Sequence, residues 1–473
     1  MKNCPYCNRK IKEYWQFCQF CNKPLLSDID VESRQTNYYT DNFEYETLYD
    51  NDDNSDYKID HTQDKNLNKK ILTIDSKISE LSKYGEPFGD LLLKKASIYY
   101  KNRKYSNTQK ELEKALESFK IDNDKLKIAI THNELGLIKE ELGFFEDSIY
   151  HFDESIQILK ELNDSKKIIQ VFNNIGNAYL QIKDIENSYQ YYQHAIDLSK
   201  KENLIYEEIK SLSNLVEILF ILKDYDRIKK ILKTLQHFFD DSEDIYGLIT
   251  NLLKYGKLYF FLGESYYEKS HEKLLDALEL INKVDDQISV YKKSKLEWEI
   301  FLFMGKIYLF WDNLSKAENL LLKSLESVRM YEVENEDINE STILNTLAEL
   351  FESKKEYEKS IEYYQLASDM YYKFGEDSKT AELKSKIGFI YLNYLDNSIK
   401  AIDSYESALK VFEKLEYFKE LAEILNILGD IYLSKELIEI AISNFEKAKE
   451  YYDDLNDQDN SKLVEEKINS LIG

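Results

Sequence analysis

Apolar side chains recur every three or four residues along most of the chain from residue 66 onward, which is the period of an amphipathic helix. The first such stretch places Ile71, Ile74 and Ile78 on one helix face, and a glycine and a proline follow it. Glycine and proline are the residues least compatible with a helix interior. The pattern therefore predicts a capping helix over 66–88, followed by further helices that each bury one face.

Small residues mark a repeat of about 40 residues in this helical pattern. They stand at Ala96, Gly136, Gly176, Val216, Gly256, Gly305, Ala348, Gly388 and Gly429, at spacings of 40, 40, 40, 40, 49, 43, 40 and 41 residues. A second small residue follows 19 to 21 residues later in most repeats, whereas the fourth repeat has Leu235 instead. The spacing predicts pairs of helices that approach closely at the first small residue, with an aromatic one turn later filling the space beside it. Because one pair cannot bury its apolar faces alone, stacked pairs form a continuous core.

Two repeats carry a recognisable motif. Residues 173–179 read Asn-Asn-Ile-Gly-Asn-Ala-Tyr and are followed by Ser188, Tyr192 and Ala195, and residues 427–432 are followed by Ala441, Phe445 and Ala448 in the same way. These segments resemble the tetratricopeptide repeat, and the 40-residue spacing is similar to the long repeats of kinesin light chains, Leu-Gly-Asn polarity adaptors and bacterial peptide-sensing regulators. The resemblance covers about residues 89–455. It implies an all-α fold, a tetratricopeptide-like α-solenoid in which helix pairs form a right-handed superhelix.

This repeat register divides the chain into five parts. We predict a zinc ribbon over 1–26, an acidic disordered linker over 27–65, the capping helix, about nine repeats and a C-terminal capping helix over 456–473 that turns Leu463, Ile468 and Leu471 inward. The predicted repeats span 89–122, 129–162, 169–202, 209–242, 249–284, 298–331, 341–374, 381–415 and 422–455. The linker contains twelve acidic residues between Asp28 and Asp64 against only Arg34 and Lys58, so it cannot bury enough apolar surface to fold.

The four cysteines of the chain all fall in the first part, as two Cys-x-x-Cys pairs made by Cys4, Cys7, Cys18 and Cys21. Four thiolates form the closed tetrahedral ligand set of a structural zinc ion and leave no open position for catalysis. The pairs resemble the N-terminal zinc ribbons of prokaryotic proteins, although Asn8 and Asn22 stand where that family has glycine. We therefore predict one structural Zn²⁺. A redox-active dithiol is the alternative interpretation of a single Cys-x-x-Cys.

The predicted ribbon is mildly basic in an otherwise acidic chain of net charge −25. Its aromatic residues Tyr14, Trp15 and Phe20 offer stacking surfaces for bases. The simpler interpretation is that these rings cover the small core of the ribbon, because the field of the whole chain repels nucleic acid and attracts basic partners. Nucleic acid is therefore expected to bind through the ribbon if it binds at all.

The resemblance implies that the first helix of each repeat lines a concave peptide-binding groove. Asparagines occupy groove positions in several repeats, namely Asn133, Asn173, Asn174, Asn177, Asn214, Asn345 and Asn426. Asparagine side chains pair with both the N–H and the C=O of an extended peptide. The alternative is compositional, because the whole chain is rich in asparagine.

Groove positions near the ends of the middle helices are apolar instead. They include Phe220, Phe260, Phe261 and Phe310, which predict an anchoring patch for an aromatic or aliphatic side chain. The alternative is that an irregular insertion over 285–297 packs over this patch.

No catalytic constellation stands out among the six histidines and the acidic runs, and no glycine-rich phosphate loop occurs. No stretch reaches the roughly 20 apolar residues of a membrane span, and the first residues lack a secretory pattern. We therefore expect a cytoplasmic, non-catalytic scaffold that binds a protein or peptide partner. The alternative is a regulatory sensor whose ribbon contacts nucleic acid or the transcription or translation machinery while the repeats bind the signal. A zinc-dependent enzyme ranks third.

Overall fold

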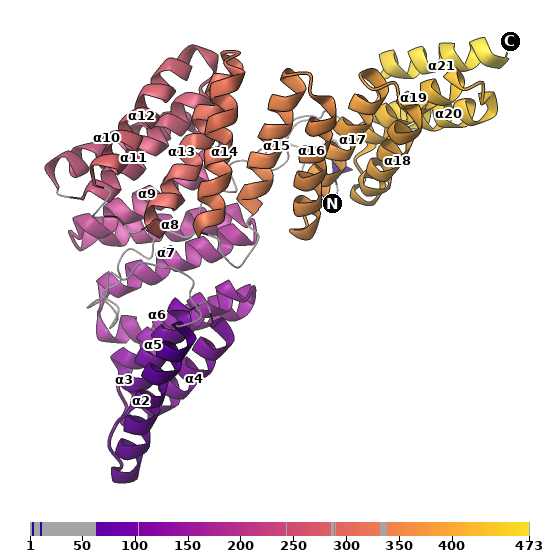
Figure 1. Cartoon of the computed structure of the whole chain (residues 1–473). Coiled ribbons are helices and arrows are strands. Elements are labelled where there is room, and N and C mark those ends of the chain that lie inside the picture. Colours follow the sequence, from indigo (N-terminus) through magenta and orange to yellow (C-terminus); the bar gives the residue numbers. More distant parts are fainter. Residues whose placement is uncertain are drawn as a thin grey trace. The chain divides into compact units, whose positions relative to one another are not determined.

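The computed structural model describes residues 2–3, 10–11 and 63–472, apart from 103, 243, 285–287, 289 and 332–337. Within these residues the chain forms 20 α-helices, one short 3-10 helix and one pair of two-residue strands (Figure 1). The strands β1 (Lys2–Asn3) and β2 (Lys10–Ile11) are antiparallel. The helices divide into two compact units at Asn251 and Leu252, which we call the first and the second unit.

Consecutive helices of the first unit pack as pairs. They are α2 (Gln63–Tyr84), α3 (Gly89–Lys101), α4 (Tyr105–Asp122), α5 (Lys125–Glu141), α6 (Phe145–Leu162), α7 (Ser165–Gln181), α8 (Ile185–Lys201), α9 (Ile205–Ile221) and α10 (Tyr225–Asp241). The capping helix α2 buries Ile71 and Ile74, and Asp75 pairs with Lys95 of α3 at 2.7 Å.

The second unit continues the same arrangement beyond α11 (Ile245–Phe261), the helix that contains the boundary. Its elements are η1 (Glu264–Tyr266), α12 (Tyr267–Lys283), α13 (Val290–Phe310), α14 (Leu314–Tyr331), α15 (Ile338–Ser353), α16 (Tyr357–Lys373), α17 (Asp377–Asn393), α18 (Ser398–Leu415), α19 (Phe418–Ser434), α20 (Ile438–Leu455) and α21 (Gln458–Ile472). We call the first helix of each pair, the odd-numbered helices from α3 to α19, the A helices. The second helices, α4 to α20, are the B helices.

Short turns between the helices are specified locally. Asn123 and Asn163 adopt left-handed backbone conformations with φ of 57° and 56°, which asparagine tolerates better than most residues. The aspartates that follow them, Asp124 and Asp164, cap the next helix by accepting a hydrogen bond from the backbone N–H three residues on. These side chains end one helix and start the next within two residues.

The glycines at the first small position make the close contact that the sequence predicts, and the side chain that meets each of them comes from the B helix. A Cβ atom added to Gly176 would lie 2.6 Å from the Tyr192 ring, and one added to Gly429 would lie 2.4 Å from the Phe445 ring. Tyr192 and Phe445 are buried on the B helix. Tyr179, the aromatic one turn along the A helix, is half-buried and stacks on Tyr191, the residue next to Tyr192 on the B helix.

The first predicted repeat starts with α3 at Gly89, whereas later A helices begin a few residues before the predicted repeat, as α5 does at Lys125 rather than at 129, because a 40-residue repeat holds longer helices than a 34-residue unit. In α21, Ile468 is buried and Leu471 packs against the same core, as predicted, whereas Leu463 is 51% exposed and Val464 is buried in its place. The prediction of an irregular insertion over 285–297 is wrong, because the residues from Val290 onward belong to α13.

The wide spacing between the fifth and sixth repeats has a structural cause. The short helix η1 is inserted between α11 and α12, and α13 is 21 residues long, whereas α11 and α12 have 17 each. The fourth repeat, which has Val216 at the first small position and Leu235 at the second, still forms the pair α9 and α10, with both side chains buried.

Candidate interaction site on the A helices

The predicted groove asparagines of the first unit bond to one another between neighbouring A helices. Asn174 donates to Asn133 at 2.9 Å, and Asn214 donates to Asn173 at 3.3 Å. Asn173 donates in turn to Ser211 at 3.0 Å. Asn133, Asn173 and Asn174 are at most 8% exposed. These amides therefore hold α5, α7 and α9 together. Their binding of a peptide stays a prediction.

The remaining asparagines are also engaged. Asn177 accepts a hydrogen bond from the buried Tyr192 hydroxyl at 2.5 Å. Asn426 accepts one from Lys467 at 2.9 Å. Asn345 donates to Glu349 at 3.3 Å, but its carbonyl oxygen is buried without a hydrogen-bond partner. Of the seven predicted asparagines, Asn345 thus keeps an unused acceptor.

Partly buried carboxylates lie beside this amide network on α5. Glu140 accepts a hydrogen bond from Gln181 of α7 at 3.1 Å. Burial, and then the neighbouring charge of Glu141, raise the pKa of Glu140 to about 8, while burial raises the pKa of Glu134 to about 7. Glu140 is therefore mostly protonated at neutral pH, so the network carries less negative charge than its composition suggests.

The predicted apolar patch separates into a core residue and a surface cluster. Phe220 is only 3% exposed, which removes it from any binding surface. Phe260 and Phe261, in contrast, are half-buried at the end of α11, and Phe310 is 49% exposed at the end of α13.

Two further rings join these three into a continuous group in the second unit, which we call the five-ring cluster. Phe303 of α13 lies 5.0 Å from Phe260 and 5.8 Å from Phe261 between ring centroids. Tyr267 of α12 stacks on Phe260 at 5.2 Å and meets the edge of Phe310 at 4.9 Å. Large rings that stay partly exposed are typical anchors of protein interfaces.

Charged residues share the helix faces that carry the five-ring cluster. Lys257 of α11 forms an ion pair with Glu299 of α13 at 2.8 Å, with both side chains at most 7% exposed. The half-buried Lys306 lies over Phe303, with its ammonium 6.0 Å from the ring centroid. The sequence analysis did not single out Glu299, Phe303 and Lys306. These residues occupy groove positions of the sixth repeat, and asparagines occupy groove positions of other repeats.

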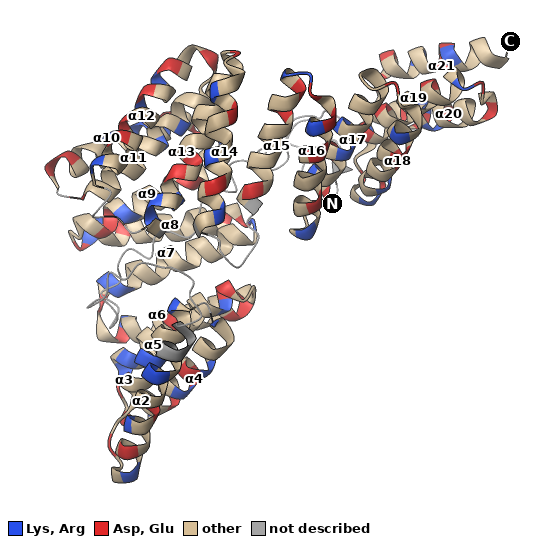
Figure 2. Ribbon diagram, viewed as in Figure 1, with Lys and Arg blue, Asp and Glu red and all other residues tan. Residues whose placement is uncertain are grey.

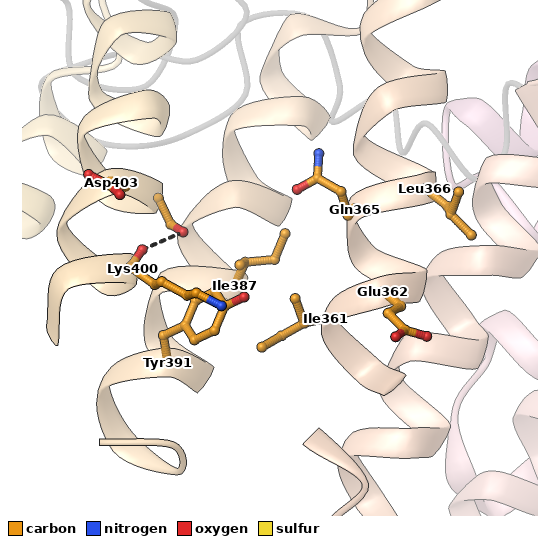
Figure 3. Close-up of a pocket in the computed structure, with 9 residues that line it drawn as sticks. Ile361, Glu362, Gln365, Leu366, Ile387, Tyr391, Lys400 and Asp403 are labelled. Carbon is orange, nitrogen blue, oxygen red and sulfur yellow. Dashed lines mark hydrogen bonds between the residues drawn. The ribbon is translucent and has the colours of Figure 1, made fainter. Parts of the chain in front are cut away.

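A separate groove of about 640 Å³ lies between the B helices α16 and α18, over α17 (Figure 3). Ile361, Leu366 and Ile387 supply its apolar lining, and Lys400 lies over the Tyr391 ring at 5.1 Å. None of its lining residues is among the asparagines and phenylalanines predicted from the repeats.

The buried His132 and the half-buried His151 form a pair between α5 and α6. Their Nδ1 atoms lie 3.0 Å apart, so one ring donates to the other. Burial, the neighbouring His151 and Lys120 lower the pKa of His132 to about 4, and burial followed by Lys139 lowers the pKa of His151. Both rings are therefore neutral at pH 7.

The predicted zinc ligands Cys4, Cys7, Cys18 and Cys21 lie outside the described residues, as does most of the predicted linker. Among the residues that are described, no three histidine, cysteine or carboxylate side chains gather as metal ligands. In that same part of the chain, no helix has both the length and the apolar character needed to cross a bilayer. Figure 2 shows that basic and acidic residues are interspersed along the helices.

Comparisons with known proteins agree with the helical repeats. Models of the tetratricopeptide repeat match residues 127–201 in the first unit and residues 341–373 and 422–455 in the second. The predicted repeat bounds 341–374 and 422–455 agree with the matches to 341–373 and 422–455. The kinesin light chain-related protein 1 of Arabidopsis thaliana is 27% identical over 198 residues, which are 37% of this chain and 32% of that protein. This chain thus spans about a third of that relative.

Two solved structures are similar at low identity. A signal transduction ATPase with numerous domains from Pyrococcus horikoshii, which has a tetratricopeptide repeat sensor, is 15% identical with a TM-score of 0.51, over 76% of this chain and 54% of that one. The apo quorum sensor NprR from B. thuringiensis is 15% identical with a TM-score of 0.49, over 75% and 98%. The described helix pairs and the similarity to the Pyrococcus horikoshii structure give an α-solenoid as the fold class. In both units, the chain carries tetratricopeptide repeats.

Proposed function

We propose that this chain is a non-catalytic interaction scaffold that binds a protein or peptide segment on its A helices. Tetratricopeptide repeats in both units support this function. The observation that carries the proposal is the five-ring cluster, because Phe310 remains 49% exposed beside four other aromatic rings. Keeping such a surface in water is unfavourable unless a partner covers it.

We further propose that residues 1–26 form a zinc ribbon that serves as a second docking module. The paired strands support this part of the proposal, because Asn3 and Lys10 are partners in the ladder and the chain between them contains Cys4 and Cys7. A hairpin that closes around a Cys-x-x-Cys pair presents both thiolates to one metal ion. The cytoplasm, which keeps thiols reduced, is the compartment that fits this site.

Site-specific photo-cross-linking tests the scaffold function. A photoreactive phenylalanine analogue at Phe310 should capture a defined partner in extracts of the source cells, because this side chain lies at the exposed end of the cluster. The matched control places the analogue at Leu322, a B-helix residue of α14 that is 43% exposed. The same products from both positions, or none from Phe310, would contradict a partner bound on the A helices.

A further inference from the structure

The groove between the B helices α16 and α18 takes no part in the proposed function. We call it the B-helix groove. The buried Ile387 of α17 and the half-buried Ile361 and Tyr391 form its floor, and the lining residue Leu366 is 51% exposed (Figure 3). Its volume of about 640 Å³ lies within the range of pockets that bind ligands in proteins. The groove therefore has room for a large side chain of a partner.

The next repeat shows how a groove of this kind is closed. There the hydroxyl of Tyr432 on α19 donates to Glu406 of α18 at 3.1 Å. Tyr391 stands at the equivalent position of the B-helix groove, 41 residues earlier. Gln365, likewise 41 residues before Glu406, donates instead to Asp369 of its own helix at 2.8 Å. Within the described residues, no hydrogen bond joins Gln365 to Tyr391, so the groove stays open.

Two exposed carboxylates lie on opposite sides of the B-helix groove. Glu362 belongs to α16 and Asp403 to α18, where they occupy the same position on successive B helices, 41 residues apart. In the described part of the chain, neither carboxylate forms an ion pair or a hydrogen bond. Both remain available to a cationic side chain of a partner.

The lysine on the groove lining does not neutralise these carboxylates. The ammonium of Lys400 lies over the Tyr391 ring, 5.1 Å from its centroid. One repeat earlier, Lys359 lies over Phe351 in the same way, at 4.9 Å. This recurring contact between a B-helix lysine and an A-helix ring belongs to the packing of each helix pair. The groove therefore combines an apolar floor with two unpaired negative charges.

We propose that the B-helix groove docks a partner segment in which a large aliphatic or aromatic side chain is flanked by arginine or lysine. The apolar side chain covers Ile361, Leu366 and Tyr391, and the flanking cations pair with Glu362 and Asp403. Charge complementarity favours this occupant, because a chain of net charge −25 attracts basic segments and repels acidic ones. None of the lining residues belongs to the five-ring cluster, so this is a second site beyond the proposed function.

Selection of random dodecapeptides displayed on phage tests the proposal, with the full-length protein as the bait. Phage that also bind a Leu366→Gln variant are removed in each round. This step discards peptides that bind elsewhere on the chain, and it imposes no charge on those that remain. The remaining peptides should combine arginine or lysine with a large apolar residue. No remaining peptide, or a set that is acidic or uncharged, would overturn the proposal.

Fluorescence anisotropy with one selected, labelled peptide measures what each part of the groove contributes. A Glu362→Gln, Asp403→Asn double variant should bind it about threefold to tenfold more weakly, because each exposed ion pair contributes modestly. Raising the salt concentration should weaken binding to the native protein more than binding to this variant, since salt screens exposed charges. Leu366→Ser should bind the peptide at least about fivefold more weakly, because apolar contact area is lost.

Matched controls separate the groove from net charge and from misfolding. A Glu326→Gln, Glu446→Gln double variant makes the same change in net charge at exposed sites on α14 and α20, and Leu322→Ser removes an exposed apolar side chain from α14. Neither control should alter binding, and all variants should keep the helical circular dichroism. Equal weakening in the matched charge control would overturn the proposal. So would a peptide that Phe310→Ser fails to bind but the groove variants bind fully, because that peptide would occupy the A helices.

Discussion

At the scale of single residues, the groove asparagines fit two interpretations, namely peptide binding and contact between repeats. Asn133 and Asn174 occupy groove positions, yet they are buried and bonded to each other across α5 and α7. An amide removed from water needs such a partner, because a buried polar group without one costs about 1–3 kcal/mol. Their first role in the free protein is therefore to join successive repeats.

A double-mutant cycle on this pair tests that role. Asn133→Leu alone should destabilise the first unit by about 1–3 kcal/mol, because it leaves the buried Asn174 amide without one partner. Asn133→Leu combined with Asn174→Leu should cost less than the sum of the single changes. Denaturant unfolding followed by circular dichroism measures both quantities. Additive effects would show that the hydrogen bond contributes nothing to stability.

At the scale of elements, the packing of α5 against α6 involves side chains whose protonation changes with pH. The His132–His151 pair joins α5 to α6, and the pKa of His132 is about 4 in the folded chain against 6.5 for an ordinary histidine. Glu134 and Glu140 on α5 have pKa values that burial raises to about 7 and 8. The two effects oppose each other. The histidines stabilise this pair of helices less as the pH falls below 6.5, whereas the glutamates stabilise it less as the pH rises from 4.5 towards 8.

The histidine contribution is isolated by comparing variants. A group whose pKa is depressed by folding binds fewer protons folded than unfolded, so stability falls as pH decreases. Between pH 7 and pH 5, the native protein should lose about 2 kcal/mol of local stability that a His132→Leu, His151→Leu double variant does not lose. Hydrogen exchange of α5 and α6 amides provides the measurement. An equal pH dependence in both proteins would show that the pair does not control this step.

At the scale of the whole molecule, the helical repeats and the N-terminal cysteines form separate parts of the sequence. The repeats bury their apolar faces between neighbouring helix pairs, as in the clusters around Phe152 and Phe445. A ribbon of about 26 residues has too little core for this and needs the free energy of metal binding to fold.

Metal analysis tests the ribbon. The purified protein should contain about one zinc ion per chain, and a Cys7→Ser, Cys21→Ser double variant should contain almost none. The helical circular dichroism should be the same in both proteins, because the described helices begin at Gln63, well after these cysteines in the sequence. Asn22→Gly is the matched control, since it introduces the residue found in similar ribbons and should retain the metal. Full zinc occupancy in the double variant would contradict the assignment.

The sequence alone determined the class of fold. Small residues at positions such as Gly176 and Gly429 recur at a nearly constant interval, because a ring of the B helix lies where a Cβ atom would be at these glycines. This requirement is local, so the repeat can be recognised from the sequence. The helix ends were equally local, because Asn-Asp pairs such as Asn163–Asp164 form the turn and the cap from adjacent residues.

The tertiary structure decided which groove residues are available to a partner. The same pattern marked Asn173, Phe220 and Phe310, but only packing between helices determines that the first two are buried and that Phe310 stays half-exposed. The pairing of Lys257 with Glu299 likewise joins residues 42 positions apart. Periodicity specifies the face on which a side chain lies, whereas burial and ion pairing depend on what the neighbouring helices bring to that face.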